Sequence, residues 1–153
     1  MEPEILTRPD ETVLGVTVRI NPSEANYREI WEQRFMPRAG EIAARAVDPS
    51  YYGVYYGTNE PGRVDFVAGM RVAEGGEATA PPGLTQRAVP GGLYAKFRSS
   101  MADLGRTWRD IYGRWLPAAE YAEDELRPAV EHYPPEMAGP DAMIEIYVAV
   151  KKK

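Results

Sequence analysis

Cysteine is absent from this chain of 153 residues, and histidine occurs once, as His132. The absence of cysteine excludes disulfides and thiolate metal sites, and one histidine is too few for the nitrogen ligands of a typical zinc site. A site for a hard cation built from carboxylates alone stays open. We expect no metal and no cofactor. A cysteine-free chain is compatible with the reducing cytoplasm, where we expect the protein to work.

Long apolar runs and basic clusters are also missing. No run approaches the roughly 20 apolar residues that span a bilayer, and the acidic residues 1–4 lack the basic-then-apolar order of a signal peptide. The formal net charge is −5, and the one basic run, Lys151, Lys152 and Lys153, is more simply explained as a solvated tail than as a nucleic-acid-binding face. We therefore expect no membrane partner and no direct nucleic-acid binding.

Aromatic residues with a polar tip are abundant instead. The chain has 10 Tyr and 3 Trp but only 3 Phe. Such rings suit a pocket for a partly polar ligand, and they equally suit a half-buried sheet, so composition does not decide between the two. Neither a Gly-x-Ser-x-Gly nucleophile motif nor a glycine-rich phosphate-binding motif occurs.

Runs of β-branched and aromatic residues predict strands, and capping patterns predict two helices. Asn21 as an N-cap, with Glu24 three positions on, predicts a helix that runs through Phe35. Ser100 starts a second capping pattern, before a helix that carries its apolar stripe as far as Trp115. The predicted strands are residues 12–20, 51–56, 64–72, 84–89, 93–97, 129–133 and 142–150.

The order strand, helix, strand, strand therefore occurs twice, over residues 12–73 and 84–150, within one domain of residues 1–153. This order predicts a duplicated α+β fold. Each helix has one apolar stripe to bury, so we expect a mainly antiparallel sheet with both helices on one face.

The last predicted strand places a carboxylate among apolar residues. Ile144, Ile146 and Val148 share one face of this strand, and Glu145 and Tyr147 share the other. The aliphatic face should pack under the helices. Glu145 then either lies on an open, solvated sheet or lines a cleft, and alternation alone favours the solvated position.

Two aromatic groups leave a similar choice open. Tyr51 and Tyr55 share one face of their strand, and Gly53 between them either leaves room for a flat ligand or marks a bulge. Trp108 and Tyr112 follow helical spacing, which is more often typical of a core stripe than of a pocket.

The ordered set of segments resembles the GyrI-like effector-binding family, also known as the bacterial transcription-activator effector-binding domain. The segments that carry the resemblance cover nearly the whole chain. They are residues 13–15 (VLG), 52–56 (YGVYY), 65–72 (DFVAGMRV), 89–97 (VPGGLYAKF), 107–117 (TWRDIYGRWLP), 128–133 (PAVEHY) and 144–148 (IEIYV). The residues before the first predicted strand are too few for a DNA-binding domain, so the resemblance is to a stand-alone member.

The resemblance implies a ligand cleft between the two halves, with a glutamate of the last strand at its base. Glu145 matches that position, which reverses the preference drawn from alternation. Members of the family bind lipophilic, often cationic, aromatic compounds. The residues expected to contact such a ligand are Glu145, Tyr147, Tyr51, Tyr55, Trp108, Tyr112 and Phe66.

Three further functions follow from the resemblance as alternatives to binding or sequestering a xenobiotic. One is hydrolysis of cyclopropane-containing genotoxins, with Glu145 as general base and Tyr112 or Tyr147 bonded to the leaving oxygen. Another is a protein partner, either DNA gyrase, which the protein would inhibit or protect, or a regulator. The last and weakest is haem binding, for which His132 is the sole candidate axial histidine.

Overall fold

The computed structural model of the protein describes residues 2–73, 80–136 and 139–153. Its strands are β1 (Glu4–Arg8), β2 (Glu11–Ile20), β3 (Tyr51–Gly57), β4 (Val64–Val72), β5 (Thr85–Val89), β6 (Gly92–Ser100), β7 (Tyr121–Glu123), β8 (Ala129–Tyr133) and β9 (Met143–Lys152). The first helical segment comprises α1 (Tyr27–Glu29), η1 (Ile30–Phe35), η2 (Met36–Arg38) and α2 (Ala39–Ala43). The second helical segment comprises α3 (Leu104–Asp110), η3 (Ile111–Trp115) and α4 (Leu116–Ala118). Within the described residues, no helix is both long and apolar enough to cross a membrane.

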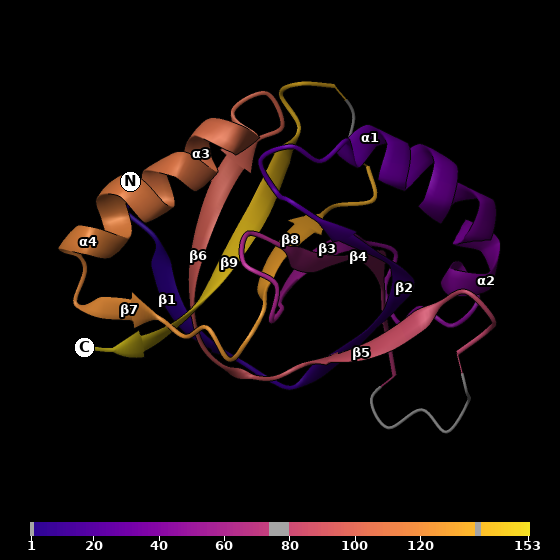
Figure 1. Cartoon of the computed structure of the whole chain (residues 1–153), viewed down its shortest axis with the longest axis horizontal. Coiled ribbons are helices and arrows are strands. Elements are labelled where there is room, and N and C mark those ends of the chain that lie inside the picture. Colours follow the sequence, from indigo (N-terminus) through magenta and orange to yellow (C-terminus); the bar gives the residue numbers. More distant parts are fainter. Residues whose placement is uncertain (1, 74–79, 137–138) are drawn as a thin grey trace.

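The strands pair antiparallel in the order β1-β6-β9-β8-β3-β4-β2-β5, with β7 beside β9. β1 leads directly into β2, and β5 leads directly into β6, along the lower rim of the sheet in Figure 1. The pairing between these two bent strands keeps one register, from Arg8 opposite Gly92 to Glu11 opposite Val89. The two ends of the strand order therefore meet through the chain, and the sheet closes into a barrel-like form.

The bend in this closing pair depends on one close backbone approach. Asp10 Oδ1 accepts a hydrogen bond of 2.6 Å from the backbone N–H of Gly91. A Cβ at Gly91 would lie 2.5 Å from the carbonyl oxygen of Arg8, so a side chain does not fit there. The corner thus needs glycine.

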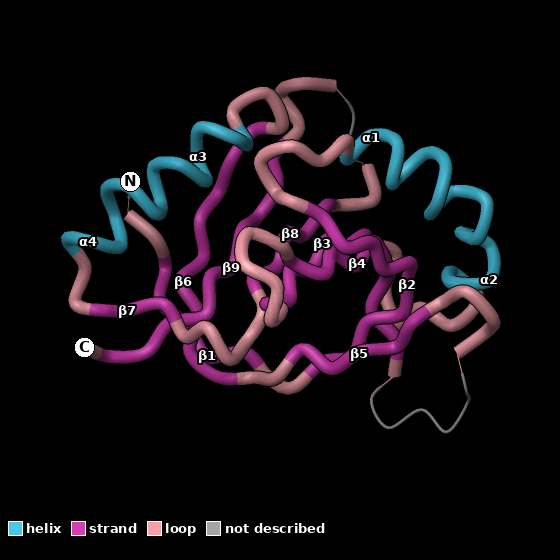
Figure 2. Tube along the Cα trace, viewed as in Figure 1, coloured by secondary structure: helices cyan, strands magenta, loops and turns pink. Residues whose placement is uncertain are grey.

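The closed sheet has an inner face and an outer face, because successive side chains of a strand point to opposite sides. The inner face holds a core that includes Val54, Val67, Tyr94 and Val130. The outer face carries both helical segments, one over each half of the sheet, as Figure 2 shows. Phe35 and Ile42 of the first segment pack against Phe66 of β4 in one core cluster. Ile111 of the second segment packs against Phe97 of β6 and Ile146 of β9 in another cluster.

The sequence predictions of an α+β class, a mainly antiparallel sheet and two helices on one face are confirmed. The predicted start of the first helix after Asn21 is wrong. Asn21 Oδ1 accepts from the backbone N–H of Ser23 at 3.1 Å and so closes a turn. The helix begins at Tyr27, because Asn26 Oδ1 accepts from the N–H of Glu29 at 3.1 Å and supplies the cap. The short strands β1 and β7 are not in the sequence prediction.

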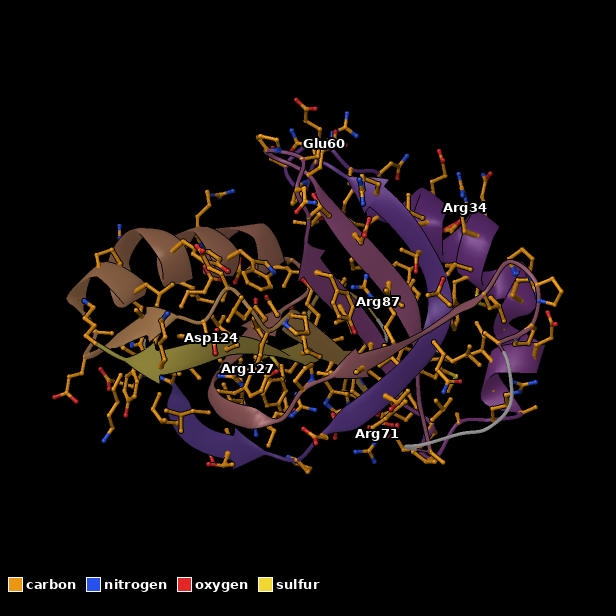
Figure 3. The ribbon with its side chains drawn as sticks, turned by 60° about the horizontal axis from the view of Figure 1, so that its bottom comes forward. Arg34, Glu60, Arg71, Arg87, Asp124 and Arg127 are labelled. Carbon is orange, nitrogen blue, oxygen red and sulfur yellow. The ribbon has the colours of Figure 1, made fainter. Side chains whose placement is uncertain are left out.

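Arginine side chains tie the strands of the closed sheet together (Figure 3). Arg127 Nη2 donates to the carbonyl oxygens of Leu93 and Val150, at 3.0 Å each, and joins the loop before β8 to β6 and β9. Arg71 on β4 lies 2.6 Å from Glu11 on β2. These bonds connect β2 with β4, and they connect the loop before β8 with β6 and β9.

Candidate ligand-binding site

A cavity of about 1200 Å³ lies on the outer face, between the two helical segments. Its volume is somewhat above that of ordinary small-molecule pockets. The first segment contributes Tyr27 and Trp31 to one wall, and the second contributes Trp108 to the other. Tyr55 of β3 and Glu131 of β8 lie on its floor. We call this cavity the aromatic cleft.

Rings from both walls contact tyrosines of the floor. The ring centroids of Trp31 and Tyr133 are 5.6 Å apart at an interplanar angle of 75°. Those of Trp108 and Tyr55 are 5.7 Å apart at 71°. Edge-to-face contacts of this kind add roughly 0.5–1.5 kcal/mol each beyond simple burial. The walls and floor of the aromatic cleft therefore form one connected layer of rings.

A π-helical turn occurs in each helical segment where it borders the aromatic cleft. η1 presents Trp31 and Phe35 to the cleft, and η3 presents Tyr112. Turns of this kind are rare and occur frequently at functional sites. Their occurrence in both halves agrees with a cleft that the two halves build together.

Glu131 is the carboxylate of the aromatic cleft. Its exposed fraction is 1%, and β8 directs it to the outer face because it pairs with Gly53 of β3 and Ile146 of β9. Glu131 Oε2 accepts from Trp108 Nε1 at 2.7 Å and from the Tyr55 hydroxyl at 3.1 Å. Its other oxygen, Oε1, accepts from the Tyr133 hydroxyl. All three donors are neutral.

Burial raises the pKa of Glu131, and the bonds from Tyr133, Trp108 and Tyr55 oppose this rise without cancelling it. Among the described residues, no arginine, lysine or histidine forms an ion pair with this carboxylate. Burial also raises the pKa of Tyr55 and of Tyr133, and the charge of Glu131 adds to both shifts. The two phenols therefore stay protonated and donate hydrogen bonds. The carboxylate, when ionised, has no cationic side chain among the described residues to balance its charge.

Gly53 makes room for this arrangement. A Cβ at this position would lie 2.9 Å from Phe66 Cε1 and 3.2 Å from Glu131 Oε1. The space between Tyr51 and Tyr55 is therefore taken by the ring of Phe66 and by the carboxylate, rather than left for a ligand. Phe66 lies behind Tyr55, with ring centroids 4.9 Å apart.

The structure places Glu145, which was expected at the base of the cleft, outside the aromatic cleft. Glu145 pairs with His132, one residue beyond Glu131, and so points to the inner face. It accepts from His132 Nδ1 at 2.9 Å and from the Tyr147 hydroxyl at 3.0 Å, and it lies 3.1 Å from Lys96 Nζ. Partial burial raises the pKa of Glu145, but the three interactions with His132, Lys96 and Tyr147 outweigh burial and lower this pKa to about 2. Glu145 is a satisfied carboxylate away from the cleft.

The other expected contacts divide in the same way. Tyr51, Tyr55, Trp108 and Tyr112 line the aromatic cleft. Tyr147 does not, because it shares the inner face with Glu145. His132 stacks on Tyr52, with ring centroids 5.0 Å apart, on that inner face too. Among the described residues, no group of three or more His, Asp or Glu side chains could hold a metal ion.

Sequence reasoning missed Glu131. The signal was its place between Ala129 and Tyr133, which share its face of a five-residue strand. What the sequence did not reveal was that β8 lies between β3 and β9. That position buries Glu131 under both helical segments.

Comparisons with known proteins agree with this architecture. Residues 1–151 match the family described as the GyrI-like small molecule binding domain. No curated protein sequence matches the chain significantly. The solved structure of SAV2435 bound to tetraphenylphosphonium has a TM-score of 0.80 at 11% identity, over 99% of this chain and 94% of that one.

Two other solved structures share the fold at low identity. The C-terminal domain of EcmrR has a TM-score of 0.72 at 13% identity, over 99% of this chain and 98% of that one. A hydrolase encoded by lin2189 from Listeria innocua has a TM-score of 0.59 at 11% identity, over 98% and 92%. These structures support the fold alone, whereas the family match spans nearly the whole sequence. The chain therefore belongs to the GyrI-like family of small-molecule-binding domains.

Proposed function

We propose that this protein binds a lipophilic aromatic cation in the aromatic cleft, with Glu131 as the counter-charge at its base. The observation that carries the proposal is a carboxylate that is 1% exposed, surrounded by rings and without a cationic partner among the described residues. A ligand cation would supply the missing charge. The role that the resemblance gives to Glu145 therefore passes to Glu131.

The energetics favour a cation over a neutral ligand. Ionising Glu131 without a partner is costly in a site of low dielectric. A cation close to this carboxylate offsets that cost, and each aromatic face beneath the cation contributes about 0.5–2 kcal/mol. Trp31 and Trp108 stand on opposite walls and can both contact a multi-ring ligand. In keeping with this class of ligand, the relative SAV2435 has been solved with tetraphenylphosphonium.

Two probes of the same shape and opposite charge test the proposal. Tetraphenylphosphonium and tetraphenylborate differ chiefly in the sign of their charge. Isothermal titration calorimetry at neutral pH should show binding of the cation and weak or no binding of the anion. Glu131→Gln should weaken binding of the cation about 10- to 100-fold, because a buried charge pair is lost.

Glu145→Gln is the matched control. It removes a carboxylate from the neighbouring strand and should leave the affinity for tetraphenylphosphonium unchanged. Equal affinity for the two probes, or an unchanged affinity in Glu131→Gln, would remove the carboxylate from the proposal. If only Glu145→Gln lost affinity for tetraphenylphosphonium, Glu145 would be the carboxylate that binds the cation, as the resemblance implies.

Hydrolysis is a second candidate, because the pKa of Glu131 is raised and two phenols adjoin it. Such a carboxylate suits a general base that activates water. One relative in fold is described as a hydrolase. Incubation with a cyclopropane-bearing genotoxin, followed by mass spectrometry, should then reveal a ring-opened water adduct that Glu131→Gln does not form. Without an adduct above the buffer background, binding stands alone. A protein partner such as gyrase or a regulator stays a prediction.

A further inference from the structure

The charges around the aromatic cleft are few and unequally placed. Among the described residues that line it, Glu131, Arg28 and Arg109 are the only charged ones. The carboxylate is buried at the floor. The two arginines belong to opposite walls, Arg28 to the first helical segment and Arg109 to the second. A ligand that fills the cleft thus meets negative charge at its base and positive charge at its sides.

Arg109 differs from its neighbours because it has no acidic partner among the described residues. Arg106 Nη2, one turn earlier, lies 2.9 Å from Asp103 Oδ1. Arg114 Nε, one turn later, lies 3.8 Å from Asp110 Oδ1. The arginine of the opposite wall is also paired with an acidic residue.

Arg28 Nε on that wall donates to Glu32 Oε2 at 2.6 Å. Arg109 is therefore the one charged group of the described cleft lining, besides Glu131, that lacks an opposite charge. Its guanidinium group is free to bind one.

The side chain of Arg109 passes close to a glycine of the same helix that also lines the cleft. Arg109 Nη1 would lie 3.6 Å from a Cβ at Gly105, an ordinary van der Waals distance, so the side chain extends back over the preceding turn. Both residues line the cleft. Trp108, the residue just before Arg109, donates to Glu131. Two consecutive residues of one helix thus differ in role: Trp108 donates to the carboxylate on the floor, and Arg109 is, within the described residues, an unpaired cation.

We infer that the ligand is zwitterionic, with a flat aromatic cation toward Glu131 and an anionic group, such as a carboxylate, that binds Arg109 at the edge of the cleft. This inference rests on the proposed function and adds the anionic group to it. A guanidinium group binds a carboxylate through two parallel hydrogen bonds, which fixes the ligand's direction as well as its place. A simple cation would leave Arg109 unused.

Rhodamine 110 and rhodamine 123 separate the two charges. Both carry the same xanthene cation, but rhodamine 110 has a free carboxylate that rhodamine 123 carries as its methyl ester. Fluorescence anisotropy should show that rhodamine 110 binds the wild-type protein about two- to fivefold more tightly, the range expected for a partly exposed ion pair. Raising the salt concentration should reduce this preference.

Arg109→Gln should abolish the preference by weakening rhodamine 110 and leaving rhodamine 123 unchanged. Arg106→Gln, on the same helix but outside the cleft, should leave both dyes unchanged. Equal affinities in the wild type, or an equal loss of both dyes in Arg109→Gln, would overturn the inference.

Glu131→Gln tells the two claims apart. If it weakens rhodamine 123 while Arg109→Gln leaves the ratio of the two affinities unaltered, the proposed function holds and the anionic group is refuted. If neither dye binds the wild type, both claims fall.

Discussion

Two glutamates on neighbouring strands have opposite surroundings. Glu131 is buried on the outer face with three neutral donors, and burial raises its pKa. Glu145 lies on the inner face, where Lys96 supplies a charge and His132 a hydrogen bond, and its pKa falls to about 2. The difference follows from one residue of register, since Glu145 pairs with His132 rather than with Glu131. The ligand-free protein thus carries one carboxylate that stabilises the fold and one that weakens it when ionised.

This difference predicts opposite pH dependence for two matched variants. Glu131 has a folded-state pKa above its ordinary value of 4.5, so its contribution to stability is lost as pH rises through that folded value. Glu131→Gln should therefore gain stability relative to wild type as pH rises above about 4.5. The amide can take part in the same network, with its oxygen toward Trp108 and Tyr55 and its NH₂ group toward Tyr133.

Glu145 has the reverse sign, because its folded-state pKa is lowered. Glu145→Gln should be less stable than wild type at pH 7, by about 1–3 kcal/mol, and the deficit should shrink as pH falls from about 4.5 toward 2. Urea denaturation of the three proteins across this pH range measures both effects. Parallel curves for the two variants would contradict the assignment of opposite environments.

At the scale of elements, Gly53 of β3 lies where a side chain would meet both Phe66 of β4 and Glu131 on the floor of the cleft. Gly53→Ala should lower the free energy of unfolding by about 1–3 kcal/mol, since the new methyl group meets Phe66 at 2.9 Å and Glu131 at 3.2 Å. It should also weaken tetraphenylphosphonium binding, because the carboxylate must shift. Gly57→Ala in the same strand is the control, with nothing within 4 Å of the new Cβ. Thermal denaturation that shows equal losses in both variants would contradict crowding around Gly53 as the cause.

The sequence predicts the helices and strands better than it predicts which strands pair with one another. Alternation places Ile146 and Val148 under the helices, as the structure has them, and so places Glu145 on the opposite face. The start of the first helix is misjudged, because Asn21 and Asn26 both suit a cap and the local pattern does not rank them. The position of Glu131 depends on pairing between distant strands, which period-two patterns do not encode.

At the scale of the whole molecule, neither half contains a complete site. The first half supplies one wall and the β3 floor, and the second supplies the other wall and Glu131. The repeated strand-helix-strand-strand order can be predicted from the sequence. The closure of the sheet cannot, because it rests on a shared register between β1–β2 and β5–β6 and on the Asp10–Gly91 corner. Closure fixes the distance between the halves, and so the width of the cleft.

A ligand that bridges the halves should protect both of them. With tetraphenylphosphonium at about 100 times its Kd, the free energy of unfolding should rise by about 2.7 kcal/mol. Hydrogen exchange followed by mass spectrometry should show slower exchange in both helical segments and in β8, because all three line the cleft. β5 contributes no described lining residue, so its exchange should slow only through the general rise in stability, and it serves as the internal reference. Protection of one helical segment alone would mean that the ligand sits on one wall, and that the two halves need not act together to bind it.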